Sequence, residues 1–200
     1  MIRKGGIGAQ RATLPRVHHP PEEAVSSAPV GTSFLQLHRQ YLLDPAGFRA
    51  RLTAPVLLWE GAKIDLNADD QWQPTQAGFN PSRPNNGDVL VLQVEKQAAK
   101  ANAFAMGITL GRVPTNDVVI DDGSISRFHA YFQFDTRKHV WTLTDADSQN
   151  GTLVGGKRTS GHQLIEDGAQ LTFGAVPTRF LLPDKLCAWL ASGADPSSLA

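Results

Sequence analysis

The amino-acid sequence predicts an all-β fold, a two-sheet β sandwich with short helices at either end. Between residues 55 and 183, short runs rich in β-branched and aromatic residues recur at the spacing of sandwich strands. Turn sequences such as Asp-Asp-Gly, Gly-Gly and Asp-Gly separate these runs. With 200 residues and 41% hydrophobic content, the chain can bury one core and has little room for a second.

The predicted strands follow one another along most of the chain. The first two are 56–59 and 89–95, with a long loop rich in Asn, Gln, Pro and Gly at 67–87 between them. We expect both strands to join the sandwich. The remaining predicted strands are 104–110, 117–120, 130–134, 140–144, 151–154, 170–173 and 179–182.

Two helices are expected before the first strand. The first begins at Ser33, whose hydroxyl would cap the helix together with Gln36 in a capping box, and it ends near Leu43. Pro45 suits the first turn of a second short helix, for which Asp44 is the expected cap. The pair resembles a helical lid.

The ends of the chain have different patterns. After Pro183, apolar residues at helical spacing predict a helix that docks on the sandwich. The first residues have few paired apolar positions, so they are expected to be disordered. The expected organisation is a disordered tail at 1–31, a helical segment at 32–54, strands and a loop at 55–102, the main domain at 103–183, and a C-terminal helix with a frayed end at 184–200.

Composition narrows the classes of partner. Nineteen basic and nineteen acidic residues give a formal net charge of zero, which removes any whole-protein attraction to nucleic acid or anionic lipid. Cys187 is the single cysteine, so no intramolecular disulfide forms, and the cysteine content does not suggest a zinc site. No apolar run approaches the ~20 residues of a membrane span. We expect a soluble, cytoplasmic monomer without metal or cofactor.

Three short blocks lie at strand ends or in the loops that follow, where a sandwich gathers residues from separate strands. They are Gly111-Arg112, Ser126-Arg127-Phe128-His129-Ala130 and Ser148-Gln149-Asn150-Gly151-Thr152.

The side chains of these blocks suit a phosphate ester, which brings about 1.5 to 2 negative charges at neutral pH and three acceptor oxygens. Arg112 offers a guanidinium fork, Ser126 a hydroxyl and Arg127 a second cation. The amide of Asn150 both donates and accepts, so it can hold a peptide main chain beside the phosphate. Together these groups favour a phosphorylated peptide over free phosphate.

Five segments in register resemble the forkhead-associated (FHA) domain family: residues 108–112, 116–120, 124–130, 148–152 and 167–174. Any one of them would be weak, but their order and spacing match the family across about 75 residues. The resemblance implies a two-sheet sandwich at 103–183 that binds phosphothreonine in partner proteins through loops at one end. Threonine in preference to serine follows from the resemblance alone.

The resemblance also implies residue roles. It assigns the phosphate to Arg112, Ser126 and Arg127, and the peptide main chain to Asn150. It assigns structural support to Gly111, His129 and Gly151. The implied function is that of a signalling adaptor for partners modified by a Ser/Thr protein kinase.

Other functions are weighed against this one. Ser126 and His129 resemble a nucleophile and its base, but no orienting acid or oxyanion loop accompanies them, so the chain is not expected to be an enzyme. The main alternative is a scaffold or assembly protein that uses the sandwich, and the helices around 34–52, for phosphate-independent contacts. A third hypothesis is that Thr13, once phosphorylated, folds back into the chain's own pocket.

Overall fold

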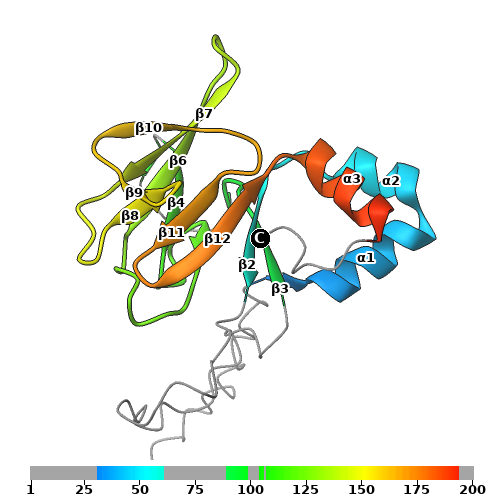
Figure 1. The fold of residues 1–200 in the computed structure, drawn as a ribbon, viewed down its shortest axis with the longest axis horizontal. Coiled ribbons are helices and arrows are strands. Elements are labelled where there is room, and N and C mark those ends of the chain that lie inside the picture. Colours follow the sequence, from blue (N-terminus) through cyan, green and yellow to red (C-terminus); the bar gives the residue numbers. More distant parts are fainter. Residues whose placement is uncertain (1–30, 61–88, 99–103, 106, 194–200) are drawn as a thin grey trace, which may run out of the picture.

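A computed structural model of the chain describes residues 31–60, 89–98, 104–105 and 107–193. Two β-sheets pack face to face, and three helices lie together on one side of them (Figure 1). The predicted two-sheet β sandwich is therefore confirmed. The tail predicted at 1–31, apart from Gly31, and the loop predicted at 67–87 lie outside the described residues, as does Thr13.

The larger sheet, sheet A, has seven strands in which every neighbouring pair is antiparallel. Strands β2 and β3 pair with each other, and β2 also pairs with β12, so both predicted early strands join the sandwich. In spatial order the strands are β1 (Thr32–Ser33), β3 (Val89–Gln93), β2 (Val56–Glu60), β12 (Val176–Leu181), β11 (Gln170–Phe173), β8 (Thr152–Val154) and β9 (Lys157–Arg158).

The smaller sheet, sheet B, has five strands. Its order is β10 (His162–Ile165), β7 (Val140–Asp145), β6 (Ala130–Asp135), β4 (Ile108–Gly111) and β5 (Val118–Val119), and only the β4–β5 pair is parallel. The chain leaves sheet B at the end of β7 and enters sheet A at β8, so residues 146–151 form a loop between the two sheets.

One predicted strand is longer than the observed one. The sequence predicted a strand from Phe104 to Leu110, whereas β4 begins at Ile108. The reason lies in Lys96, whose ammonium group donates hydrogen bonds to the backbone carbonyls of Phe104 (2.8 Å) and Gly107 (3.1 Å). These carbonyls therefore point at a side chain instead of a neighbouring strand.

The main core lies between the two sheets and consists of alternate residues from their facing strands. Leu57 and Trp59 of β2, Phe132 of β6 and Phe180 of β12 are almost completely buried there. This is the alternation expected for strands with one face on the core.

A second core lies on the outer face of sheet A, where the helices α1 (Phe34–Leu43), α2 (Pro45–Arg51) and α3 (Pro183–Ser192) pack. Val56 and Leu58 point to this side of β2, so residues 56–59 are buried on both faces and are continuously apolar. The helices cover β2, β3 and β12 and lie away from β8 and β9 (Figure 1).

The helix caps agree only in part with the sequence. The Asp44 carboxylate accepts a hydrogen bond from the backbone N–H of Gly47 at 2.9 Å, as predicted. Ser33 makes no side-chain cap, because it belongs to β1 and pairs with Leu90 in extended geometry. None of the helices in the described part of the chain is long and apolar enough to cross a membrane.

Candidate functional site

The three sequence blocks meet at one end of the sandwich. The backbone N–H of Arg112, which follows β4, donates to the carbonyl of Ser126 at 3.1 Å. The hydroxyl of Ser126 accepts from the backbone N–H of Gln149 at 3.0 Å, and the side-chain amide of Asn150 donates to the carbonyl of Ser124 at 2.7 Å. Hydrogen bonds thus join the loop after β4, the loop before β6 and the loop 146–151 into one unit.

His129 holds two of these loops together from inside. Its side chain is fully buried, and its Nδ1 accepts a hydrogen bond from the backbone N–H of Ser126 at 3.1 Å. Nδ1 must therefore be unprotonated, and Nε2 carries the proton and donates to the carbonyl of Gly151 at 3.2 Å. Burial lowers the pKa of His129 below its ordinary 6.5 and outweighs the opposing effects of the Gly151 carbonyl and of Asp145.

Gly111 lies where the backbone of Arg127 crosses the end of β4. A Cβ atom at this position would collide with the Arg127 carbonyl oxygen and would lie 2.6 Å from the side-chain nitrogen of Asn116. Asn116 itself donates to the carbonyls of Val113 (3.0 Å) and Arg127 (2.6 Å). Only glycine allows this close approach, which fixes the backbone that carries Arg127 beside the backbone that carries Arg112.

Asp145 organises the loop 146–151. Its carboxylate accepts from the backbone N–H and hydroxyl of Ser148 (2.8 and 2.7 Å) and from the hydroxyl of Thr152 (2.5 Å). Burial alone would raise the pKa of Asp145, but these hydrogen bonds and nearby His129 bring it below its ordinary 3.8. The Ser148 hydroxyl also accepts from the N–H of Gly151 at 2.9 Å, so the backbone around Asn150 is fixed from both sides.

Alongside the exposed carboxylate of Asp147, several groups that face solvent in this unit are donors. Arg112 and Arg127 are exposed, and neither guanidinium has a hydrogen bond or ion pair with another residue that the structure describes. Asn150 uses one N–H on Ser124 and keeps its second N–H and its carbonyl oxygen available. Chemically, the arrangement can take up an anion between two cations and a peptide group beside it.

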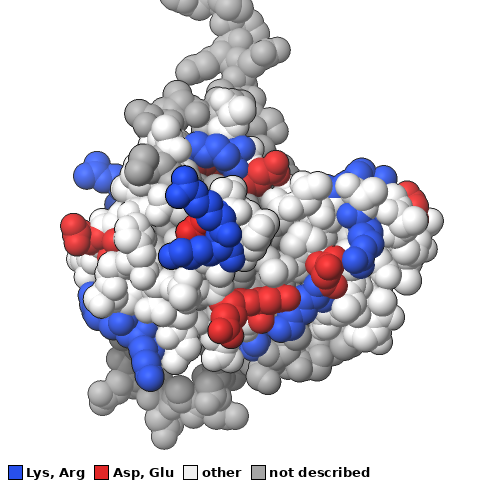
Figure 2. Space-filling model, turned by 90° about the horizontal axis from the view of Figure 1, so that it is seen from above, with Lys and Arg blue, Asp and Glu red and all other residues white. Residues whose placement is uncertain are grey.

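The chain has a formal net charge of zero, and on one face of the molecule its charges are mixed. The face seen in Figure 2 carries Lys and Arg side chains interspersed with Asp and Glu, without a large field of one sign. Long-range attraction therefore contributes little, and recognition of an anion depends on direct hydrogen bonds from fixed donors. The described segments hold no group of three or more His, Cys, Asp or Glu side chains that could bind a metal ion.

Three residues that shape the site had no role in the sequence analysis. Asn116 and Asp145 act through partly buried hydrogen bonds to loops; the sequence analysis included Asn116 only as the first residue of the segment 116–120 and gave neither residue a role. Arg158 lies on β9, and no sequence pattern brings it to the site, because its position depends on the pairing of β9 with β8.

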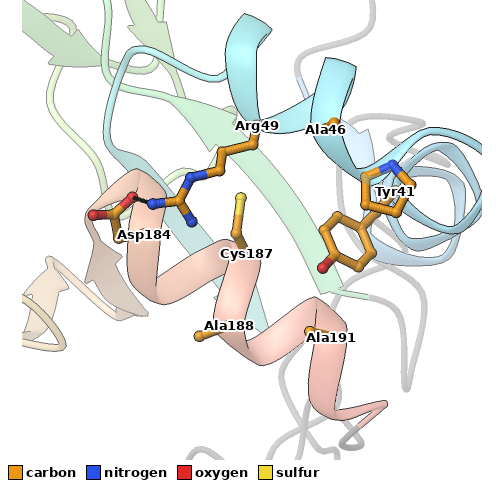
Figure 3. A pocket seen from close by; sticks show the side chains of 8 residues that line it. Tyr41, Ala46, Arg49, Asp184, Cys187, Ala188 and Ala191 are labelled. Carbon is orange, nitrogen blue, oxygen red and sulfur yellow. Dashed lines mark hydrogen bonds and ion pairs between the residues drawn. The ribbon is translucent and has the colours of Figure 1, made fainter.

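A separate cavity of about 360 Å³ lies among the helices (Figure 3). The Arg49–Asp184 ion pair (2.7 Å) lies at its margin, and the Cys187 side chain points from α3 toward α2. Burial raises the pKa of this thiol, which disfavours the reactive thiolate. The cavity is lined by Tyr41, Pro45, Ala46, Arg49, Asp184, Cys187, Ala188 and Ala191, and none of these belongs to the three sequence blocks.

One segment of the chain matches the model of a known protein family. The family model of the FHA domain matches residues 108–174, which include all seven residues predicted for the site. A comparison with curated proteins finds no significant match.

Solved structures similar to this chain include Mycobacterium tuberculosis EmbR in complex with a low affinity phosphopeptide. That similarity has 28% identity and a TM-score of 0.36 and covers 39% of this chain and 20% of EmbR, so the chain spans about a fifth of EmbR's length. The FHA domain of the CT664 protein from Chlamydia trachomatis has 16% identity and a TM-score of 0.42, with 64% of this chain and 97% of that domain covered.

A third similar structure is the kinase-interacting FHA domain of kinase associated protein phosphatase, KAPP, in Arabidopsis. It shows 20% identity and a TM-score of 0.41, and the similarity covers 64% of this chain and 93% of that domain.

Proposed function

Residues 108–174 match the FHA domain family, and from this premise we propose that the protein binds phosphothreonine-containing segments of partner proteins. In this proposal it is a non-catalytic adaptor in the cytoplasm, and a Ser/Thr kinase creates its binding site on the partner. Binding then depends on the phosphorylation state of the partner, so the contact is regulated without any change in this chain.

One observation supports the proposal: hydrogen-bonded loops carry two arginines without a partner among the described residues, a serine hydroxyl and an asparagine amide. Arg112 donates its guanidinium fork to two phosphate oxygens, Ser126 donates its hydroxyl to a third, and Arg127 neutralises remaining charge. Asn150 exchanges hydrogen bonds with the peptide main chain. The Ser126 hydroxyl supports this role, because its oxygen accepts from Gln149 and its proton remains available to a ligand.

The supporting residues keep these groups in place before a ligand arrives. His129, Gly111 and Asn116 fix the backbone under Ser126 and Arg127 through partly buried hydrogen bonds and close backbone packing. A site whose donors are already ordered loses less conformational entropy on binding.

The test is calorimetric titration of the full chain with a phosphothreonine peptide library and with the same peptides unphosphorylated. Arg112→Ala is expected to weaken binding at least about tenfold, because a hydrogen bond to a charged group contributes about 1.5–3 kcal/mol. Arg137→Ala is the matched control: Arg137 is exposed in the β6–β7 turn, at the opposite end of β6 from the site, and its removal is expected to change nothing.

A second candidate is a scaffold with phosphate-independent contacts. It is favoured by α1, on which Leu35, Leu42 and Leu43 are 61%, 64% and 86% exposed. If the folded wild-type chain bound phosphorylated and unphosphorylated peptides equally, or bound neither, the adaptor proposal would be rejected and the scaffold would take its place.

A further inference from the structure

The side chain of Arg158 lies against the backbone of the candidate site. A Cβ atom at Gly151 would be 2.5 Å from both Cζ and Nη2 of Arg158 and 2.9 Å from its Nε. Three atoms of the planar guanidinium are thus almost equally near, so the group extends over the α-carbon of Gly151. This residue has a φ of +81° and directly follows Asn150. Gly151 therefore supplies both the left-handed backbone and the space that the guanidinium occupies.

Strand pairing explains how Arg158 reaches this place. In the β8–β9 pair, Arg158 is opposite Leu153, and Thr152 next to Leu153 points into the core. Leu153, Gly151 and Arg158 therefore share the outer face of sheet A, because neighbouring residues of a strand face opposite sides.

The guanidinium of Arg158 is not used within the described structure. Arg158 is exposed and has no hydrogen bond or ion pair there, unlike Arg49 and Arg51, which pair with carboxylates. The carboxylate of Asp145, which organises the same loop, is occupied by Ser148 and Thr152. All the guanidinium donors of Arg158 thus remain available for an anion beside Asn150.

The loop that contains Asn150 runs from the sheet that carries Arg112 and Arg127 to the sheet that carries Arg158. Arg112 and Arg127 belong to loops of sheet B, Arg158 belongs to sheet A, and the loop that contains Asn150 connects the sheets. A peptide held at Asn150, with its phosphate on the sheet B side, would place a nearby residue over Gly151. Residues of an extended peptide advance by about 3.3–3.6 Å each, so this residue is within a few positions of the phosphothreonine.

We propose that Arg158 binds a second anionic group of the phosphopeptide, either an acidic side chain or a second phosphate a few residues from the phosphothreonine. This inference rests on the proposed phosphothreonine site and adds the preference of that site for its ligand. A carboxylate and a phosphate share the feature that matters, two oxygens that fit the guanidinium fork.

The experiment compares four peptides by calorimetry: a phosphothreonine peptide with neutral flanks, the same peptide with Glu within three residues on either side, one with a second phosphothreonine there, and the unphosphorylated acidic peptide. For the wild-type chain we expect about three- to tenfold tighter binding of the second or third peptide than of the first. Comparing the affinities of the second and third peptides shows whether Arg158 prefers a carboxylate or a phosphate.

The variant Arg158→Gln is expected to abolish this advantage, so that affinity for the acidic phosphopeptide falls much more than affinity for the neutral-flank peptide. Lys157→Gln removes the same charge from the neighbouring exposed position of β9 and is expected to keep most of the advantage. Equal thermal stability of the variants and the wild type will show that the fold is intact.

Two results would overturn the inference while leaving the proposed function in place. One is equal affinity of the wild type for neutral and acidic phosphopeptides; the other is an equal loss for both peptides in Arg158→Gln. If the wild type bound no peptide in a phosphate-dependent manner, the proposed function would fail, and this inference with it.

Discussion

The protonation of one buried side chain links the candidate site to pH. His129 is neutral in the folded chain, because Nδ1 accepts from Ser126 and burial lowers its pKa below 6.5. In the unfolded chain the imidazole takes up a proton below about pH 6.5, whereas the folded chain takes it up only at a lower pH. The stability that neutral His129 contributes is therefore fully present above pH 6.5 and is lost as pH falls below that value.

This predicts that the free energy of unfolding decreases between pH 7 and pH 5, and that His129→Asn removes part of this decrease. Denaturant unfolding at several pH values measures it. His139→Asn is the control, because His139 is an exposed residue with φ 54° in the β6–β7 turn, a conformation that Asn tolerates. An identical pH slope in wild type and His129→Asn would contradict the assignment. The carboxylates of Asp117 and Asp145 act in a separate pH range. Because their pKa values in the folded chain are below 3.8, the stability that they contribute is lost only as pH falls below about 3.8.

At the residue scale, much of the candidate site could be predicted from the sequence, because its polar and charged residues lie in short contiguous blocks. Arg112, Ser126 and Asn150 are each part of such a block, and the structure brings them together. The place of Arg158 could not be predicted in the same way. Arg158 reaches Gly151 only because β9 pairs with β8. The sequence does not predict β9, because both of its residues are exposed and show no apolar alternation.

Among the elements, the buried carboxylate of Asp117 connects the two sheets. It accepts hydrogen bonds from the N–H and hydroxyl of Thr109 on β4, and from Lys96 and the N–H of Gln97, which follow β3. Burial alone would raise the pKa of Asp117, but these hydrogen bonds lower it. The segment after β3 in sheet A is thus fixed to β4 and β5 in sheet B.

We predict that Asp117→Asn lowers the free energy of unfolding by about 1.5–3 kcal/mol, because hydrogen bonds to a buried charge are lost. Denaturant unfolding at pH 7 measures this. Asp147→Asn removes the same charge from an exposed residue with φ 56° and should change stability by less than about 0.5 kcal/mol. Similar values for the two variants would show that Asp117 does not fix the segment.

Secondary structure was predictable where apolar residues alternate and failed where polar contacts decide. β6, β7 and β11 follow the expected pattern closely, because each presents core residues to one face. β10 was missed because three of its four residues are exposed, and its pairing with β7 defines it. The early start predicted for β4 was wrong because Lys96 occupies the backbone carbonyls before it.

For the whole molecule, the helices and the sandwich share one sheet. β2 is buried between the sheet–sheet core and the helical core, and Leu181 of β12 and Leu186 of α3 are fully buried in the latter. We therefore expect the helices to stabilise the strands that the sandwich needs and not to unfold as an independent unit.

The corresponding prediction is that Leu186→Ala costs about 2–5 kcal/mol of unfolding free energy and that the chain still unfolds in one transition. Leu35→Ala makes the same chemical change on the exposed side of α1 and should cost little. Calorimetric unfolding of the two variants makes the comparison. Two separate transitions in Leu186→Ala, with the sandwich melting at the wild-type temperature, would show that the helices are independent.

The edges of the two sheets have a further consequence, for solubility. An exposed edge strand offers unpaired N–H and C=O groups to other chains and promotes aggregation. In the described structure β1, β9 and β5 have two residues each, and only β10, at the fourth edge, is longer. β9 consists of a lysine and an arginine, the kind of charge that discourages strand addition. The positive pair of β9 thus also protects the sandwich against edge-to-edge association at high concentration.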